Sequence, residues 1–407
     1  MNKKLLIAII VIVVIAVGGY FLLKQKSTND KIHANEPSEI VIGYNCDMSG
    51  GTIAPFGVSG MQGFQIAVDE INAKGGILGK KIRPVILDDK ADKEISKKNM
   101  EQLIFQDKAV AVIGPANSTN ALYWLELAQE NEIIVIVPIA TASEITTKYS
   151  ERPRNYIFGI RNLDKVQSST LIAWAIQKTN NGKIAVIYEP TPFGLQGEKD
   201  ATEVLARWGK IPVLTKSFDK NASIEDLAKI IKAAKEAKAD GIYFFSYPEY
   251  TAKLLKAVKQ VKDYNPVMFG PAANSANELW DTAGNLAQDF VFISSFNSDR
   301  DQKTKELNAK VIKKYGNPPA KFSATAIAYD SVYLIKASIE KSGSTDKVAV
   351  RDALETIEKY DGVYKFYDNP FDKMNHDALN SKDFYLAKWV DGTVVDIKDD
   401  ISKLEIR

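Results

Sequence analysis

Three segments of the sequence combine hydroxyl side chains with glycine or proline directly after an apolar, strand-like run. They span 49–57, 114–120 and 138–143. Each is expected at the carboxyl edge of a parallel sheet, where open α/β proteins bind their ligands. A helix that starts there offers N–H donors and a partial positive charge, which suit a carboxylate. The spacing alone leaves a second interpretation open, in which Ser118 or Thr119 only caps its own helix.

Residues for nucleophilic or metal chemistry are scarce. The sequence has one cysteine, Cys46, and two histidines, His33 and His376. A Ser-His-Asp or Cys-His enzyme needs a base within hydrogen-bond reach of its nucleophile, and neither histidine lies in a segment that favours this role. The acidic run 88–92 is interpreted as a strand-to-helix turn with Asp92 as the helix N-cap, rather than as a metal loop. We therefore expect no cofactor, no metal site and no enzymatic activity.

The composition narrows the classes of protein further. The 407 residues include Lys+Arg 53 and Asp+Glu 51, which gives a net charge of +2, and 45% of them are hydrophobic. This length corresponds to two or three domains, each with a core of its own. The hydrophobic fraction is too high for a disordered chain. The balanced charge gives no basic excess for tracking phosphates, so no nucleic-acid partner is expected.

Apolar strands alternate with amphipathic helices through the body of the chain. The run 133–139 belongs to a first series of strands, and the runs 183–189 and 241–247 belong to a second. Such alternation indicates parallel sheets that are covered by helices on both faces. The two series therefore predict two α/β lobes. The tail is mostly helical and is expected to close with a hairpin about Asp391 and Gly392.

Residues 5–23 form an uncharged apolar stretch. At about 1.5 Å per residue they would make a helix of about 28 Å, close to the thickness of the bilayer hydrocarbon. A cleaved signal peptide has a shorter apolar core and a small-residue cleavage site, whereas this stretch is longer and ends in bulky residues. We expect 1–26 to be a single-span anchor, with a cleaved signal as the alternative. The polar segment 27–38 is expected to be a tether that holds the body outside the cytoplasm, at the cell membrane.

Several of these segments are similar to those of a known family. The helix and turn AVDEINAKGGILGKKI and the runs AVAVIGPANSTNAL and IIVIVPIATASEIT resemble the leucine/isoleucine/valine-binding proteins of ABC importers. The resemblance continues in order through NLDKVQS, KIAVIYEPTPFGLQG, FFSYPEY and VMFGPA. It covers nearly all of residues 39–300, and the last hundred residues fit more loosely.

The resemblance implies a fold of two Rossmann-like α/β lobes joined at a hinge by three crossovers. Together with the apolar start, this predicts an α/β fold preceded by one N-terminal transmembrane helix. Lobe 1 is expected at 39–163 with 297–378 returning to it, and lobe 2 at 164–296 with 379–407 returning to it. The family's function implies a receptor that traps a small amino acid, branched-chain or aliphatic, between the lobes. It would deliver this ligand to ABC permease subunits in the membrane, and we expect it to be a monomer.

The positions that match the family's ligand contacts are expected to meet the carboxylate, the amine and the side chain of the ligand. They are Ser118, Thr119, Ile139 and Thr141 for the carboxylate end, Asp164 for the amine, and Phe56, Phe193 and Tyr247 for the apolar side chain.

One position departs from the family. Branched-chain receptors often have an acid after the Gly-Pro of the second lobe, which holds the ligand amine, whereas here Gly270 and Pro271 are followed by Ala272. A buried ammonium is costly without acceptors or a carboxylate, so Asp164 or Glu249 would have to substitute. This departure leaves open a receptor for an amide, urea or an aromatic acid.

Two other classes of protein remain as alternatives. A ligand-sensing domain that signals to a membrane partner is disfavoured because the sequence contains no kinase or helical signalling segment. A surface glycosidase would need two carboxyl groups about 5–10 Å apart in one cleft, and the sequence offers no such pair.

Overall fold

The computed structural model describes residues 39–296, 298 and 300–397. The chain divides into two units, Met1–Ile40 and Val41–Arg407, and the architecture given below is that of the second unit.

The expected anchor at 1–26 and tether at 27–38 lie outside the described residues. Within the ranges that are described, none of the helices is both long and apolar enough to cross a membrane.

The first lobe is built on a five-stranded sheet with the strand order β2-β1-β3-β4-β5. The pairs β1–β3, β3–β4 and β4–β5 are parallel. Strands β3, β4 and β5 are buried along their whole length because helices cover both faces of the sheet, as their apolar sequences predict. The strands are β1 (Glu39–Cys46), β2 (Lys81–Asp88), β3 (Ala111–Ile113), β4 (Ile134–Val137) and β5 (Ile157–Gly159).

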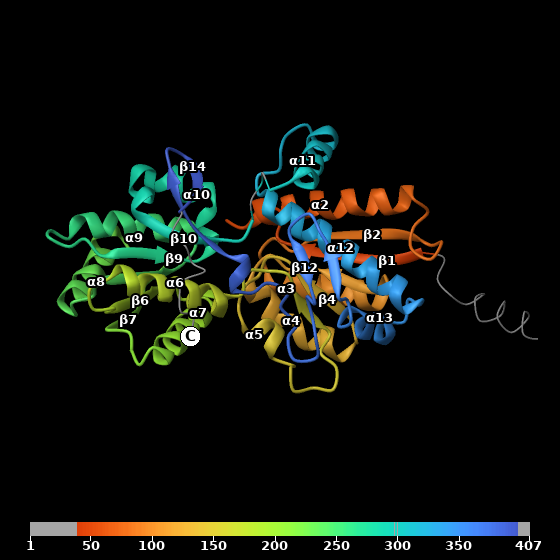
Figure 1. Cartoon of the computed structure of the whole chain (residues 1–407), viewed down its shortest axis with the longest axis horizontal. Coiled ribbons are helices and arrows are strands. Elements are labelled where there is room, and N and C mark those ends of the chain that lie inside the picture. Colours follow the sequence, from red (N-terminus) through yellow and green to blue (C-terminus); the bar gives the residue numbers. More distant parts are fainter. Residues whose placement is uncertain (1–38, 297, 299, 398–407) are drawn as a thin grey trace, which may run out of the picture. The chain divides into compact units, whose positions relative to one another are not determined.

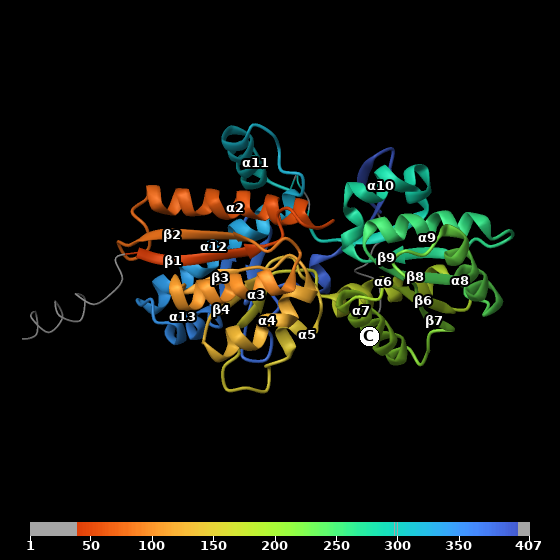
Figure 2. The same cartoon turned by 180° about the vertical axis from the view of Figure 1, so that it is seen from behind.

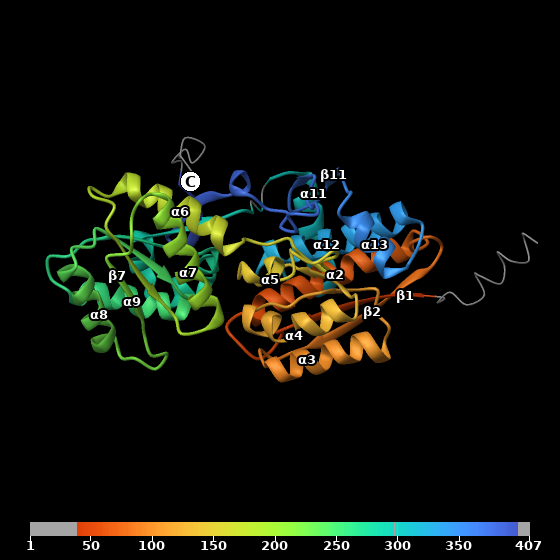
Figure 3. The same ribbon diagram turned by 90° about the horizontal axis from the view of Figure 1, so that it is seen from below.

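Helices α3 and α4 lie on one side of this sheet, in front of the strands in Figure 2, and α12 and α13 lie on the other (Figure 3). A core that includes Met100, Leu103, Val112, Trp124 and Leu125 fills the space under α3 and α4. The helices of this lobe are α2 (Ala54–Ala73), α3 (Lys93–Glu101), the π-helix η1 (Gln102–Gln106), α4 (Ser118–Glu130), α5 (Glu144–Thr147), α11 (Gln302–Tyr315), α12 (Phe322–Ser342) and α13 (Lys347–Leu354).

Helix α12 returns from the C-terminal part of the sequence and packs along α2 (Figure 1). Gly63 permits this close approach, since a Cβ there would lie 2.0 Å from the Thr325 carbonyl oxygen. The Lys321 N–H donates to Ser59 Oγ (2.9 Å), and the Thr325 hydroxyl donates to the Ser59 carbonyl (2.8 Å). The start of α12 is thereby fixed beside the start of α2.

The second lobe is built on a seven-stranded sheet with the order β14-β13-β10-β9-β8-β6-β7. Its β7–β6–β8–β9–β10 part is parallel, and β13 and β14 add an antiparallel edge. The strands are β6 (Ile184–Tyr188), β7 (Leu214–Ser217), β8 (Gly241–Phe245), β9 (Val267–Gly270), β10 (Phe290–Ser294), β13 (Tyr385–Val390) and β14 (Thr393–Asp396).

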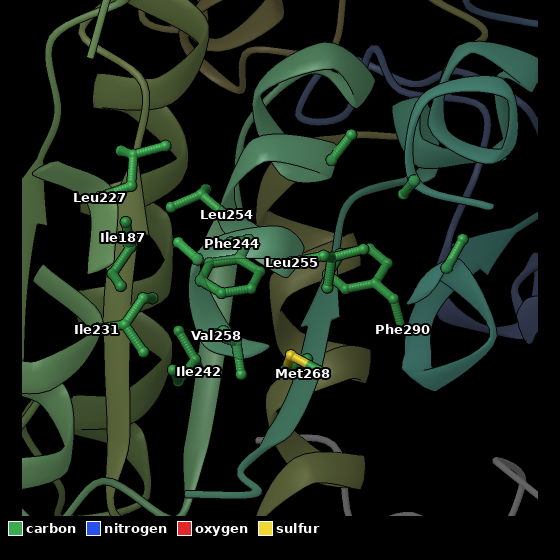
Figure 4. Close-up of a cluster of buried hydrophobic side chains, with 14 of the residues drawn as sticks. Ile187, Leu227, Ile231, Ile242, Phe244, Leu254, Leu255, Val258, Met268 and Phe290 are labelled. Atoms are coloured by element: carbon green, nitrogen blue, oxygen red, sulfur yellow. The ribbon is translucent and has the colours of Figure 1, made fainter. Parts of the chain in front are cut away.

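A hydrophobic core joins α8 and α9 to this second sheet (Figure 4). Leu227 and Ile231 of α8 and Leu254 of α9 meet Ile187 of β6 and Phe244 of β8, and all five side chains are buried. The helices are α6 (Asp164–Lys178), α7 (Pro192–Arg207), α8 (Ile224–Glu236), α9 (Pro248–Gln260), α10 (Asn277–Ala283) and the 3-10 turns η2 (Ala272–Ser275), η3 (Gly284–Asp289) and η4 (Ser381–Asp383).

Within the described residues the chain passes between the two sheets after β5, after β10 and ahead of β13. This arrangement confirms the predicted two-lobe α/β fold. The expected hairpin is also present, because Val390 pairs with Thr393 and both Asp391 and Gly392 have positive φ. The short ribbon of β11 (Lys359–Asp361) and β12 (Phe366–Asp368) was not expected, since strands of three residues are too short to show a period in the sequence.

Candidate functional site

A pocket lies where the strand ends of both sheets face one another, and residues of both lobes and of the crossovers line it. Among the residues that the structure describes, every lining side chain is uncharged. The lining residues are Ile53, Phe56, Ala116, Ser118, Pro138, Ile139, Ala140, Thr141, Asn162, Gln167, Phe193, Tyr247, Pro271, Ala272, Ala273, Ser275, Ser294, Ser295, Phe296, Ser323, Ala324, Ile327 and Tyr364.

Six of the eight positions expected to contact ligand line this pocket. They are Phe56, Ser118, Ile139, Thr141, Phe193 and Tyr247. The other two, Thr119 and Asp164, do not line it.

Ser118 is the first residue of α4, and it does not cap the helix. Asn117 is the N-cap, because its side-chain oxygen accepts from the Asn120 N–H at 2.8 Å. The Ser118 hydroxyl instead accepts from the Ala142 N–H at 3.2 Å. The capping interpretation of Ser118 and Thr119 was therefore wrong, and Ser118 lies at the pocket wall, at the start of the helix.

Thr141 lies in the loop between β4 and α5. Its carbonyl oxygen accepts from Arg161 Nη1 (2.9 Å) and from the Asp164 N–H (3.0 Å). Through the Ala142 contact with Ser118, this loop and the start of α4 form one hydrogen-bonded wall. The first lobe thus presents hydroxyl groups and a helix N-terminus, which are suitable partners for a carboxylate.

The second lobe contributes an aromatic wall. The rings of Phe193 and Tyr247 are stacked, with centroids 4.7 Å apart and an interplanar angle of 9°. Phe193 also packs on Phe245 at 4.7 Å. Thr191 caps α7 by accepting from the Gly194 N–H (3.2 Å), and this cap sets the position of Phe193 in the first turn.

A buried acid lies behind this aromatic wall. Glu189 Oε2 accepts from the Tyr247 N–H at 2.8 Å, and the Thr191 hydroxyl donates to its other oxygen at 2.5 Å. Burial raises the pKa of Glu189 to about 7, although these hydrogen bonds act in the opposite direction. Glu189 fixes the backbone at Tyr247 without lining the pocket itself.

Phe56 lies in the first turn of α2, and the ammonium of Lys321 is 5.4 Å from the centroid of its ring. Lys321 Nζ is also 3.6 Å from Glu278 Oε2 of the second lobe. Burial lowers the pKa of Lys321, and Glu278 opposes this shift. A second contact between the lobes joins the Thr52 hydroxyl to Glu249 Oε1 at 3.1 Å. Phe56 thus lies beside the first of these two polar contacts between the lobes.

Asp164 is fully buried behind the pocket wall. Its Oδ1 accepts from Gln167 Nε2 at 3.1 Å, and Gln167 Oε1 in turn accepts from the Ala272 N–H at 2.8 Å. Burial raises the pKa of Asp164 well above its usual value, and the charge of Asp200 adds to this rise. The Thr141 hydroxyl and the guanidinium of Arg161 oppose it. Gln167 therefore lies between this acid and the position of Ala272.

Gln167 was missed by the sequence analysis. It is 1% exposed and lines the pocket from the first turn of α6, three residues after Asp164 and so on the same helix face. The three-residue spacing from Asp164 is the feature of the sequence that could have identified Gln167. The crossover residues Asn162, Ser295 and Tyr364 were also missed; both Asn162 and Tyr364 hydrogen-bond with the Ser295 hydroxyl. No local pattern identifies them, because only the path of the chain between the lobes brings them together.

The residues considered for metal or catalytic chemistry have structural surroundings. Asp92 caps α3 by accepting from the N–H groups of Glu94 (2.8 Å) and Ile95 (3.0 Å), as the sequence predicted. Among the described residues no group of His, Cys, Asp and Glu is arranged to hold a metal ion. His376 stacks on Phe158 with centroids 4.0 Å apart, and Cys46 is buried. His33 lies outside the described residues.

Curated relatives match most of the chain. The Leu/Ile/Val-binding protein homolog 3 of Brucella melitensis is 26% identical over 366 residues, which are 89% of this chain and 94% of that protein. The leucine-, isoleucine-, valine-, threonine- and alanine-binding protein of Pseudomonas aeruginosa is 25% identical over 353 residues, which are 86% of this chain and 90% of that protein.

Solved structures share the fold. A periplasmic binding protein type 1 from Bordetella pertussis superposes with a TM-score of 0.76 at 24% identity, covering 89% of this chain and 98% of that one. The substrate binding protein LivJ of Streptococcus pneumoniae, solved with isoleucine, has a TM-score of 0.69 at 24% identity and covers 88% of this chain and 100% of that one.

The family model described as "Periplasmic binding protein" matches residues 39–393, which include the first sheet, the second sheet as far as the start of β14, and every residue that lines the pocket. This match confirms the resemblance seen in the sequence and the expectation of a solute-binding receptor rather than an enzyme. The chain belongs to the periplasmic binding protein family.

Proposed function

We propose that this chain is the extracytoplasmic receptor of an ABC importer, and that it binds a small aliphatic amino acid in the pocket between its two lobes. One observation carries the proposal: hydroxyl groups and a helix start line one side of the pocket, whereas stacked aromatic rings line the other. This combination suits a ligand with a carboxylate at one end and an apolar group at the other. The names of the relatives, which include binding proteins for leucine, isoleucine and valine, support the same ligand class.

In this proposal the first lobe binds the carboxylate. Ser118 donates its hydroxyl, Thr141 turns its hydroxyl from Asp164 to the ligand, and the backbone at Ile139 and the N–H groups at the start of α4 complete the site. Thr119, which does not line the pocket, would contribute only through its backbone N–H. Charge-assisted hydrogen bonds of this kind are about twice as strong as neutral ones.

The second lobe and Phe56 enclose the side chain. Phe193 and Tyr247 form a flat apolar surface, and Phe56 faces the same pocket from the first lobe. A pocket of this kind distinguishes ligands that differ by one methylene by only about 1–3 kcal/mol. Leucine and valine, which differ by one methylene, would therefore be discriminated by no more than this amount.

The amine of such a ligand has the fewest partners in this pocket, because no carboxylate of the described residues lines it. Ala272 supplies no carboxylate, and we propose that Asp164 serves the amine through Gln167, which hydrogen-bonds with both Asp164 and Ala272. The absence of charge among the described lining residues also favours a second candidate, a receptor for an amide, urea or an aromatic acid.

Calorimetry separates these ligands. The body of the protein, residues 39–407, is titrated with L-leucine, L-valine, L-phenylalanine and urea. Micromolar or tighter binding of leucine and valine supports the first proposal. Binding of urea or of an aromatic acid without leucine binding selects the second. A protein that gains neither heat of binding nor thermal resistance from any of a wide set of amino acids and amides is not such a receptor.

We also propose a division of the body into lobe 1 (39–163 with 297–378) and lobe 2 (164–296 with 379–407), which rotate about the crossovers when ligand binds. Small-angle scattering with and without ligand tests this division, because closure lowers the radius of gyration. The same data, with light scattering, test the proposed monomer.

For residues 1–26 we propose a single-span anchor, and for 27–38 a tether that places the body near permease subunits. Mass spectrometry of the protein isolated from cells tests the anchor. An N-terminus after residue 23 would mean that the segment is a cleaved signal. A sensor that works without a transporter is distinguished by ligand uptake, which would be unaffected when the receptor is deleted.

A further inference from the structure

A buried arginine connects the loop that carries Thr141 to the crossovers. Arg161 follows β5 at the first crossover and is 1% exposed. Its Nη1 donates to the carbonyl oxygens of Thr141 (2.9 Å) and Ala142 (3.3 Å), and its Nη2 donates to the Thr146 hydroxyl (2.9 Å). Three hydrogen bonds of one guanidinium therefore hold the segment from Thr141 to Thr146.

The counter-charge of Arg161 comes from a distant part of the sequence. Asp377 Oδ1 is 3.1 Å from Arg161 Nη2, and Asp377 Oδ2 accepts from the Thr146 hydroxyl at 2.6 Å. The Gly159 carbonyl accepts from the Ala378 N–H at 2.9 Å, so the two chain segments run side by side. The first is the crossover after β5, and the second leads to the crossover ahead of β13. Arg161 thus connects two crossovers with one loop of the site.

The Thr141 carbonyl is also held from the second lobe. It accepts from the Asp164 N–H, which belongs to the first residue of α6. A rotation of the second lobe about the crossovers therefore acts on the same carbonyl oxygen that Arg161 holds. Only the planar fork of an arginine can donate to this set of acceptors while paired with a carboxylate.

We propose that Arg161 is a positioning residue, which holds Thr141 in the orientation that meets the ligand and couples this contact to rotation about the crossovers. The inference rests on the proposed function, because Thr141 is there the group that touches the ligand. Arg161 itself does not line the pocket.

The chain offers a matched control for Arg161. Arg351 of α13 is 4% exposed, is paired with Glu355 and Asp352, and donates to the Asn155 carbonyl at 2.9 Å. It does not line the pocket, and within the described residues it has no direct hydrogen bond to the segment 141–146. Its connection to that segment is indirect, through Asn155, whose side-chain amide donates to the Thr146 carbonyl at 2.8 Å. Arg161→Lys and Arg351→Lys therefore make the same chemical change at two arginines that are both buried and ion-paired.

The first test is calorimetry with L-leucine on Arg161→Lys, Arg351→Lys, Thr141→Val and the double variant Arg161→Lys/Thr141→Val. We expect Arg161→Lys to weaken binding about tenfold, as for the loss of one charge-assisted hydrogen bond, and Arg351→Lys to leave it unchanged. Because Arg161 acts through Thr141, the double variant should bind about as weakly as Thr141→Val alone. Equal losses in the two lysine variants, or fully additive losses in the double variant, would overturn the proposal.

The second test needs no ligand. Amide hydrogen exchange of the ligand-free variants should be clearly faster in residues 141–147 for Arg161→Lys and much less affected there for Arg351→Lys, because only Arg161 bonds to this segment directly, while both variants lose a similar amount of thermal stability. Unchanged exchange in 141–147 of folded Arg161→Lys would show that the arginine does not hold the loop. If the wild-type protein does not bind L-leucine, the proposed ligand class fails and the exchange result alone decides the role of Arg161.

Discussion

The two walls of the pocket are built in different ways. On the first lobe, Ser118 and Thr141 are held by directional hydrogen bonds, among them the one from the Ala142 N–H to the Ser118 hydroxyl. On the second lobe, Phe193 and Tyr247 are held by ring stacking, with Glu189 accepting from the backbone behind them.

Because of this difference, we expect the two walls to have different roles in ligand binding. A hydrogen bond depends steeply on distance and angle, so a polar wall recognises a group that is the same in every ligand, such as the α-carboxylate. A stacked aromatic surface contributes in proportion to the apolar area it covers and tolerates several shapes. We therefore expect the first lobe to determine whether a ligand binds, and the second to determine which of several similar ligands binds best.

The largest loss of ligand affinity is expected from changes in the polar wall, which Ser118 and Thr141 form on the first lobe. Ser118→Ala removes a hydroxyl partner of the carboxylate and should weaken the binding of leucine, isoleucine and valine alike, by about 2–3 kcal/mol. Calorimetry with the three amino acids measures this loss. Thr119→Ala, at the adjacent residue that does not line the pocket, is the control and should bind normally. A Ser118→Ala loss that differs strongly among the three ligands would contradict the assignment of the polar wall to their common group.

A smaller and more selective effect is expected from the aromatic wall. Phe193→Ala removes one ring of the stack and should weaken leucine binding by about 1–2 kcal/mol, with less effect on alanine, which covers less of the ring. The ratio of the leucine and alanine affinities is the measurement. Phe218→Ala, which removes a buried ring away from the pocket, controls for loss of packing in the same lobe. Equal losses for both ligands would assign Phe193 to the fold rather than to selection.

The acid behind the aromatic wall predicts a pH dependence of stability. The pKa of Glu189 is raised to about 7 in the folded protein, so the folded state favours the protonated form. Its contribution to stability is present below the pKa of an unfolded glutamate and is lost as the pH rises through about 7. The slope is at most one proton, about 1.4 kcal/mol per pH unit.

Glu189→Gln should flatten this slope between pH 5 and pH 8, as measured by urea unfolding. Asp301→Asn is the control, because hydrogen bonds and Arg300 lower the pKa of Asp301 to about 2, against the effect of burial. Its contribution is lost only as the pH falls through about 2, so the slope above pH 5 should not change. An unchanged slope in Glu189→Gln would mean that Glu189 is ionised throughout this range.

The smallest loss of ligand affinity is expected at the ion pair that joins the two lobes. Lys321→Met removes the ion pair with Glu278 and should weaken ligand binding by about 1 kcal/mol, because the closed arrangement loses one partly buried contact between the lobes. The double variant Lys321→Glu/Glu278→Lys should recover part of the loss. Binding that is unaffected by Lys321→Met and by high salt would show that this pair does not contribute to closure.

The sequence was sufficient for most of the architecture. The apolar strands and amphipathic helices identified both sheets, and the tight-turn pair Asp391 and Gly392 located the final hairpin. It was less informative about the ribbon that begins at Lys359, whose two strands are only three residues long each and are joined by a few pairs. Pattern reasoning succeeds where burial imposes a period on the sequence, and it fails where only a few hydrogen bonds define a strand.

The candidate site was predicted in part. Most of the expected positions line the pocket because they follow buried strands, and parallel strands bring their carboxyl ends to one edge. Asp164 also follows a strand, but it does not line the pocket: it is buried behind Gln167, which lies on the same face of α6 and donates a hydrogen bond to it. Arg161 carried no local signal, because its partner Asp377 is more than two hundred residues away in the sequence.

The sequence by itself determined that the chain forms two α/β lobes with hydroxyl-bearing strand ends, because hydrophobic periodicity and turn residues act over a few neighbouring positions. The tertiary structure alone decided which side chains share the pocket, which acid is kept out of it, and which arginine connects the loop of Thr141 to the crossovers. These outcomes depend on how distant segments cross and pack, and burial then sets the charge and the hydrogen-bond partners of each group.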